Sequence, residues 1–172
     1  MADNLVLMDH DGGVDDYLST ALLLTMEHLH VLGIVVTPAD CYIQPAVSAT
    51  RKLLDLLGHS DIPVAESTVR GLNPFPRIFR RDSFTVDHLP ILNERDEVRA
   101  PLAAESGQEF MVRVLHAAPE QVTLLATGPL STIAAALDRD PSVELPETLG
   151  SALLAGRDSA RPDTYGTTIW HN

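Results

Sequence analysis

The hydrophobic residues of this chain alternate between short continuous runs and longer stretches in which they recur every three or four positions. Continuous apolar runs of about four to eight residues are typical of strands that are buried on both faces of a sheet. Such runs predict strands at residues 5–8, 30–37, 62–67 and 122–127.

The stretches between these runs have the spacing of amphipathic helices. The predicted helices cover residues 15–28, 45–58, 106–119 and 128–141. Pro45 in the first turn and Gly58 after the last turn are start and stop signals for the second of them. Strands that alternate with helices predict an α/β fold, in which a mostly parallel, Rossmann-like sheet carries helices on both faces. We expect one such domain over residues 1–172.

The segment 68–100 is rich in Pro, Arg, Asp and Asn and has no regular period. A connection of this length inside a compact domain is usually a lid or a binding loop, so we expect an irregular functional loop here. Its basic residues Arg77, Arg80 and Arg81 are interpreted as a solvated face of that loop.

Composition and charge argue against several classes of function for this chain. The 172 residues include 24 acidic and 12 basic ones, which gives a net charge of −12. This excess of negative charge argues against binding to nucleic acids or anionic membranes through general electrostatic attraction. The apolar runs are too short to span a membrane, and the N-terminus MADN lacks the basic region of a signal peptide. The single Cys41 fits a buried structural thiol in a reducing compartment, so we expect a cytoplasmic protein.

The stretch LVLMDHDGGVDDYLSTALLL, residues 5–24, places four aspartates directly after the first predicted strand. They are Asp9, Asp11, Asp15 and Asp16, and the stretch contains no Lys or Arg that would balance them. In parallel α/β sheets, ligands bind beyond the carboxyl ends of the strands. Asp40 follows the second predicted strand, and Thr127 ends the fourth. All of these residues are therefore expected at the same edge of the sheet.

Helix capping and metal binding are two interpretations of the aspartates. Capping accounts for two of them, because one carboxylate can cap a helix and another can complement its dipole. A divalent cation such as Ca²⁺ accounts for more of them, because it takes several oxygen ligands and offsets their repulsion. Asp9 and Asp11 are two apart on an extended chain and are expected to face the same way, and Gly12 and Gly13 permit a tight turn toward the helix. We favour the metal site.

A third interpretation is phosphoryl transfer. An apolar strand that ends in D-x-D-G resembles the first motif of haloacid-dehalogenase-type phosphatases, with Asp9 as nucleophile and Asp11 as acid and base. Thr37 fits their second motif. The only lysine, Lys52, lies in the middle of a predicted helix, and the later aspartate pair has no role in that scheme. This interpretation stays open as an alternative.

The complete motif D-x-D-x-G-x-D-D at residues 9–16 resembles the inosine–uridine-preferring nucleoside hydrolase family. Segments 33–58 and 122–137 are similar to later parts of that family, and the resemblance spans about residues 5–66 and 104–137. It implies an α/β domain around a mostly parallel sheet. It also implies cleavage of the N-glycosidic bond of ribonucleosides to ribose and free base, with Ca²⁺ in the site and a homo-oligomeric assembly.

The resemblance also implies roles for single residues around the metal. Asp11 would be both a calcium ligand and the base that deprotonates the attacking water. Asp16 would be a bidentate ligand, and Thr127 would offer its backbone carbonyl to the metal. Asp9 would lie behind these ligands and steady the motif.

On the substrate side, the resemblance implies that Asp15 binds ribose hydroxyls. Asp40 stands near the position of a substrate-binding Asn in the family, although the local spacing differs. His88 and His171 are candidates by residue type for protonating the leaving base, and a surface position is the alternative for each.

Three features depart from the family pattern. Gly12 replaces a usual Pro or Asn, and Thr132 replaces an Asn. After Leu154 the similarity fades, whereas the family continues with another Asp ligand, a His and an E-x-N segment. We therefore expect the family domain to be incomplete at its C-terminus, its C-terminal half missing, and hydrolysis by this chain alone to be weak. A non-catalytic metal- or nucleoside-binding homologue is the alternative.

Overall fold

A parallel sheet forms the centre of the computed structural model, which describes residues 4–70 and 75–143. Within these residues the strand order is β3-β2-β1-β4. The strands are β1 (Asn4–His10), β2 (Leu29–Val36), β3 (Val64–Glu66) and β4 (Val122–Ala126), and every neighbouring pair is parallel. The predicted mostly parallel sheet is thus confirmed.

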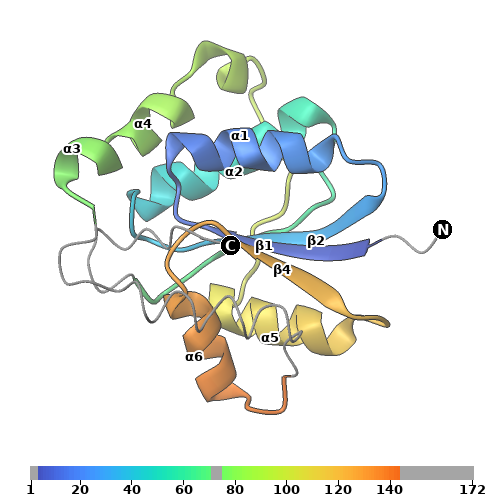
Figure 1. Cartoon of the computed structure of the whole chain (residues 1–172). Coiled ribbons are helices and arrows are strands. Elements are labelled where there is room, and N and C mark those ends of the chain that lie inside the picture. The colour runs from blue at the N-terminus through green and yellow to red at the C-terminus, as the bar shows by residue number, and fades with distance from the viewer. Residues whose placement is uncertain (1–3, 71–74, 144–172) are drawn as a thin grey trace.

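Helices cover both faces of this sheet. Helices α1 (Val14–Leu24) and α2 (Ile43–Leu57) lie on one face, and α5 (Gly107–Ala117) and α6 (Ser131–Arg139) lie on the other (Figure 1). Alternate side chains of β1 point to opposite faces. Val6 and Met8 join the core beneath α2, whereas Leu7 packs with Phe110 and Met111 of α5. The predicted α/β fold with helices on both faces is confirmed.

Two helix boundaries differ from the prediction. The helix predicted over 15–28 ends at Leu24, because the Thr25 hydroxyl donates to the Leu22 carbonyl at 2.7 Å and caps the last turn. The helix predicted over 128–141 begins only at Ser131, after a turn through Gly128 and Pro129. Cys41 is a free, buried thiol, as expected.

The segment 68–100 is not the irregular loop that the sequence predicts. It contains α3 (Arg77–Arg80), α4 (Asp82–Asp87) and the 3₁₀ helix η1 (Pro90–Asn93). Helices of four to six residues offer too few apolar positions to show a period, which explains why the pattern misses them. Val86 and Leu92 are nevertheless buried against α1 and α2.

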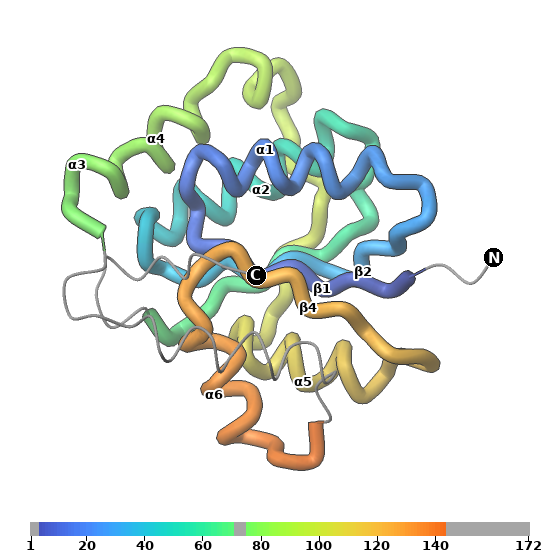
Figure 2. The backbone as a smooth tube through the Cα atoms, in the orientation of Figure 1, coloured from blue at the N-terminus to red at the C-terminus, as the bar shows by residue number. Residues whose placement is uncertain are grey.

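The carboxyl ends of the strands lie at one end of the molecule. The loops that follow β1 and β4 reach this end, and α3 lies on the same side of the molecule (Figure 2). Among the described residues, no helix has the length and apolar character required to cross a bilayer. Leu154, after which the similarity to the family fades, lies outside the described residues.

Candidate active site

The loop between β1 and α1 makes its tight turn at Gly12. This residue has φ +79°, and a Cβ atom there would lie 2.5 Å from the Cβ of Cys41, so only glycine fits. Gly13 has an ordinary φ of −63° and is the N-cap of α1, but a Cβ on it would lie 2.6 Å from Oδ1 of Asp15. The turn brings the start of α1 back to the end of β1.

Asp16 joins the loops that follow β1 and β4. Its Oδ2 accepts the backbone N–H of Asp11 at 3.1 Å and that of Gly13 at 2.9 Å. Its Oδ1 accepts the hydroxyl of Thr127 at 2.6 Å. Helix capping is therefore one function of Asp16, and the same carboxylate draws three of the expected site residues together.

Asp11 lies beside Asp16 and against the loop after β4. A Cβ on Gly128 would be 2.7 Å from the Cβ of Asp11, so glycine permits this close approach. Burial, followed by the negative charges of Asp16, Asp40 and Asp9, raises the pKa of Asp11 to about 9. The neighbouring negative charges therefore favour the protonated form of this carboxyl.

The pKa of Asp40 is raised for the same reasons, but by less. Burial and the carboxylates of Asp15, Asp16 and Asp82 raise its pKa to about 6, and Arg80 partly opposes them. Its Oδ1 is buried and has no hydrogen-bond partner within the described residues. The structure therefore places Asp40 beside the aspartates of the β1–α1 loop, as the sequence predicts.

The sequence predicts that Arg80 lies on the solvated face of a loop, and for this residue the prediction is wrong. Arg80 ends the short helix α3, is half-buried, and holds its guanidinium 5.1 Å from the ring centre of Tyr42. The Tyr42 ring in turn packs on Phe84 of α4, with ring centres 5.3 Å apart. Arg77 and Arg81 are exposed.

Asp9 points to the opposite face of β1 from His10 and is almost completely buried. Its Oδ1 accepts the Thr37 hydroxyl at 2.7 Å, and Thr37 accepts the hydroxyl of Thr132 at 2.5 Å. The hydroxyl oxygens of Ser67 and Thr132 lie 2.7 Å apart, so a chain of polar side chains links β1 and α6 to the residues that follow β2 and β3. Burial, together with the negative charge of Asp16, raises the pKa of Asp9 to about 7 despite the Thr37 hydrogen bond.

His10 is the last residue of β1 and is buried beside the loop that leads to α1. The sequence analysis did not identify it as a site residue. Its Nδ1 accepts the N–H of Gly12 at 3.1 Å, and its Nε2 lies 3.2 Å from the hydroxyl oxygen of Thr50. The Thr50 hydroxyl donates to the Ala46 carbonyl at 2.9 Å, so Nε2 must be the donor to Thr50. Burial lowers the pKa of His10, although Asp16 opposes this shift. An imidazole on the same strand face as Val6 and Met8 was the signal available in the sequence.

The residues at these strand ends fit a hard divalent cation. Carboxylate and carbonyl oxygens are the donors that Ca²⁺ takes, and the unpartnered oxygens of Asp9 and Asp40 lie in a region of unbalanced negative charge. Residues 4–70 and 75–143 hold no group of three or more His, Cys, Asp or Glu side chains in a metal-binding arrangement. The expected ligand set needs only two carboxylates, those of Asp11 and Asp16, because its third member is the Thr127 carbonyl.

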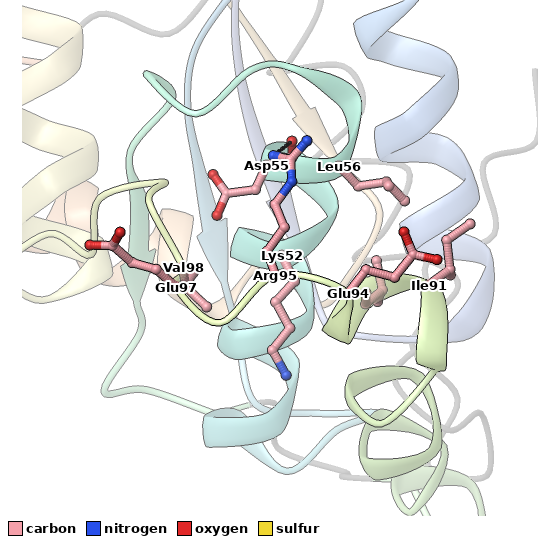
Figure 3. Close-up of a pocket in the computed structure, with 9 residues that line it drawn as sticks. Lys52, Asp55, Leu56, Ile91, Glu94, Arg95, Glu97 and Val98 are labelled. Atoms are coloured by element: carbon pink, nitrogen blue, oxygen red, sulfur yellow. Dashed lines mark hydrogen bonds between the residues drawn. The ribbon is translucent and has the colours of Figure 1, made fainter.

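Two other sequence candidates lie apart from this cluster. His88 is exposed after α4, and its Nδ1 is 2.8 Å from the Phe84 carbonyl oxygen of that helix. Lys52 is one of the residues that line a pocket between α2 and η1 (Figure 3). Its ammonium donates to Asp87 and Asn93. The phosphatase interpretation is therefore not favoured, since its lysine is engaged elsewhere. His171 lies outside the described residues.

The model of the inosine-uridine preferring nucleoside hydrolase family matches residues 6–151. This chain belongs to that family. The match includes every aspartate of the loop after β1 and the turn at Thr127, so the resemblance inferred from the D-x-D-x-G-x-D-D motif is confirmed.

Individual members of the family show the same likeness. A probable uridine nucleosidase 2 of Arabidopsis thaliana is 30% identical over 152 residues, which are 88% of this chain and 46% of that protein. A pyrimidine-specific ribonucleoside hydrolase of Citrobacter koseri is 29% identical, over 80% of this chain and 44% of that protein. The chain thus spans about half the length of these relatives.

Solved structures agree with the sequence comparisons. The crystal structure of an inosine-uridine preferring nucleoside hydrolase from Bacillus anthracis is similar, with a TM-score of 0.80 and 46% identity over 82% of this chain and 47% of that chain. A plant nucleoside hydrolase shares the fold, with a TM-score of 0.66 and 22% identity over 82% of this chain and 44% of that chain.

Proposed function

We propose that this chain supplies the metal-binding and ribose-binding residues of a nucleoside hydrolase, which cleaves the N-glycosidic bond of ribonucleosides to ribose and free base. The observation that carries the proposal is the unbalanced group of carboxylates at the strand ends, where the pKa of Asp11 is raised to about 9. Membership of the nucleoside hydrolase family supports the class of reaction.

Calcium is the metal that we propose for this site. Asp11 and Asp16 would hold it through their carboxylates, and Thr127 through its backbone carbonyl. When bound, the ion would polarise a water molecule and lower the pKa of that water. The hydrogen bond between Thr127 and Asp16 supports the grouping of these residues, because it fixes the loop after β4 beside the loop after β1.

Asp11 is the proposed general base. The water oxygen forms a bond to the ribose C1′ atom, its proton passes to the Asp11 carboxylate, and the electrons of the C1′–N bond leave with the base. This role requires ionised Asp11. A neighbouring positive charge favours the ionised carboxylate, so the raised pKa in the metal-free chain and the proposed role are compatible.

Asp15 and Asp40 are the proposed ribose contacts. Asp15 is exposed beside the N-terminus of α1, and Asp40 has a buried oxygen without a partner within the described residues. Both carboxylates can accept hydrogen bonds from sugar hydroxyls. Asp9 would support the loop from behind through Thr37. A homo-oligomeric assembly and a cytoplasmic location remain predictions from the sequence.

An assay of the purified chain with inosine and with uridine tests the proposal. Weak release of free base, which EDTA abolishes and added calcium restores, is the expected result. The same assay on Asp11→Asn should show no release, while the circular dichroism of the variant stays that of the parent. Calcium binding without any hydrolysis would instead identify a non-catalytic metal- or nucleoside-binding homologue.

A further inference from the structure

We propose that His10 is a positioning residue for the cation site, because its Nδ1 holds the Gly12 N–H and thereby keeps Asp11 and Asp16 together. The inference rests on the proposed function, since it concerns the affinity of the same site. It assigns a role to the residue between the two aspartates of D-x-D, which does not itself contact the proposed ion.

Three consecutive backbone N–H groups define the loop. Those of Asp11 and Gly13 converge on Oδ2 of Asp16, at 3.1 and 2.9 Å. The middle one, from Gly12, donates instead to Nδ1 of His10 at 3.1 Å. The turn is therefore held by two different side chains, one in α1 and one in β1.

His10 is itself held by α2. Its Nε2–H donates to the Thr50 hydroxyl oxygen, whose own proton goes to the Ala46 carbonyl. The imidazole is fully buried, and the Tyr17 ring lies edge-on to it with ring centres 6.0 Å apart. The donor at Nε2 leaves Nδ1 as the acceptor, and burial holds the ring in place, so the turn is fastened to the core and not only to its own residues.

A neutral acceptor suits this position for an electrostatic reason. Asp11 and Asp16 lie next to each other, since the Asp11 N–H donates to Oδ2 of Asp16, and two like charges in this arrangement repel each other and tend to open the loop that carries them. An arginine or lysine could offset the repulsion, but its charge would compete with a bound cation. The neutral imidazole restrains the backbone without adding charge, and its Nδ1 lies 3.7 Å from Oδ2 of Asp16.

Two substitutions separate the hydrogen bonds of His10. In asparagine, Oδ1 is as many bonds from Cα as Nδ1 is in histidine, so His10→Asn keeps an acceptor for Gly12 and loses the link to Thr50. In glutamine, Nε2 is as many bonds from Cα as Nε2 is in histidine, so His10→Gln keeps a donor to Thr50 but has no acceptor at the position of Nδ1, because its amide oxygen lies one bond further from Cα. Thr50→Val is the matched control, because it removes the link between His10 and α2, together with the Thr50–Ala46 hydrogen bond inside α2, and leaves the acceptor for Gly12 in place.

Calorimetric titration of calcium into the metal-free full chain compares these variants. We expect His10→Gln to bind calcium about tenfold more weakly than the parent, while His10→Asn and Thr50→Val keep the parent affinity. All three variants should melt at lower temperature than the parent, since each loses at least one buried hydrogen bond. A role in stability alone would make the affinities follow the melting temperatures. Parent affinity in His10→Gln, or equal losses in His10→Asn and His10→Gln, would overturn the inference.

Hydrogen exchange of the Gly12 amide gives a second measurement that does not depend on metal. We expect a protected amide in the parent and in His10→Asn and a rapidly exchanging one in His10→Gln. Equal protection in the parent and in His10→Gln would contradict the inference, whatever the calcium result. A parent chain that binds no calcium but shows the expected exchange pattern would refute the proposed function and leave the anchoring of Gly12 by His10 intact.

Discussion

Two acidic regions of the molecule differ in the partners of their carboxylates. On the outer face of α2, Asp87 accepts a hydrogen bond from the Lys52 ammonium at 2.8 Å. At the carboxyl ends of the strands, Asp11 and Asp40 face other carboxylates, and the pKa values of both are raised. The residue type is the same, and the partners differ.

Asp55 shows what pairing achieves on the outer face of α2. Burial by itself raises the pKa of this carboxyl, but hydrogen bonds from Ser60 and from the N–H groups of Arg99 and Ala100, together with the charge of Arg95, lower the pKa overall. Its two oxygens accept those N–H groups at 2.6 and 2.9 Å. The carboxylate thus fastens the segment before α5 to α2, and its charge is satisfied within the fold.

This difference separates a structural from a functional use of acidic residues. Carboxylates whose charge is already balanced stabilise the fold and have no need of an external cation. Carboxylates that are buried together without balance cost stability, and such groups concentrate at functional sites. The following changes test whether the two regions really divide in this way.

The largest expected effect follows removal of Asp16. We expect Asp16→Ala to lose calcium binding completely in a calorimetric titration, because both of its oxygens organise the loops after β1 and β4. Loss of the cap on α1 should also cost about 1 kcal/mol of stability. Asp87→Ala is the control from the outer face of α2, where the carboxylate pairs with Lys52, and this variant should bind calcium as the parent does. Retained binding in Asp16→Ala would remove this residue from the site.

Asp11→Asn should separate function from stability. The amide cannot accept the proton of the attacking water, so any hydrolysis of inosine or uridine should disappear. The metal-free variant should unfold at higher temperature than the parent at pH 8, because the parent must protonate the Asp11 carboxyl when it folds at this pH and asparagine needs no proton. A lower melting temperature would show that the Asp11 carboxylate has a stabilising partner that is not among the described residues.

The pH dependence of stability should show the same imbalance. The pKa of Asp11 in the folded chain is about 9, against an ordinary value of 3.8, so the folded state holds this proton more tightly than the unfolded state. Stability of the metal-free chain should therefore fall as the pH rises from about 7 to about 9. His10 does not oppose this trend, because it is neutral in both states above its ordinary pKa of 6.5.

Thermal melts of the parent across that pH range, with and without calcium, measure this effect. Saturating calcium should flatten the slope, and Asp11→Asn should reduce it. A metal-free parent whose stability rises from pH 7 to pH 9 would contradict the interpretation of the strand-end carboxylates as unbalanced.

The smallest effect on calcium binding is expected from a substitution on the outer face of α2, where the carboxylates have partners within the fold. Asp55→Ala leaves the N–H groups of Arg99 and Ala100 without their carboxylate partner, and Ala100 is fully buried. We expect a loss of about 1–3 kcal/mol in the free energy of unfolding, measured by urea denaturation. Calcium affinity should be unchanged, so a marked loss of affinity would show that the two acidic regions are coupled.

Much of this architecture could be predicted from the sequence. The apolar runs located all four described strands, because a strand buried on both faces must be apolar throughout. The concentration of Asp9, Asp11, Asp15 and Asp16 after the first strand pointed to the candidate site, since parallel strands end at a common edge. The short helices α3 and α4 were missed because they pack through a few residues, such as Val86, whose spacing has no period.

The sequence by itself determined where carboxylates gather, because strand order and chain direction bring the ends of β1, β2 and β4 to one edge. Only the tertiary structure decided which of those carboxylates are balanced and what holds them. The alternation of a strand gives His10 and Asp9 opposite faces, but their partners Thr50 and Thr37 come from elements 40 and 28 residues away. Burial and distance set the charge of a side chain, and both depend on packing between segments that are remote in the sequence.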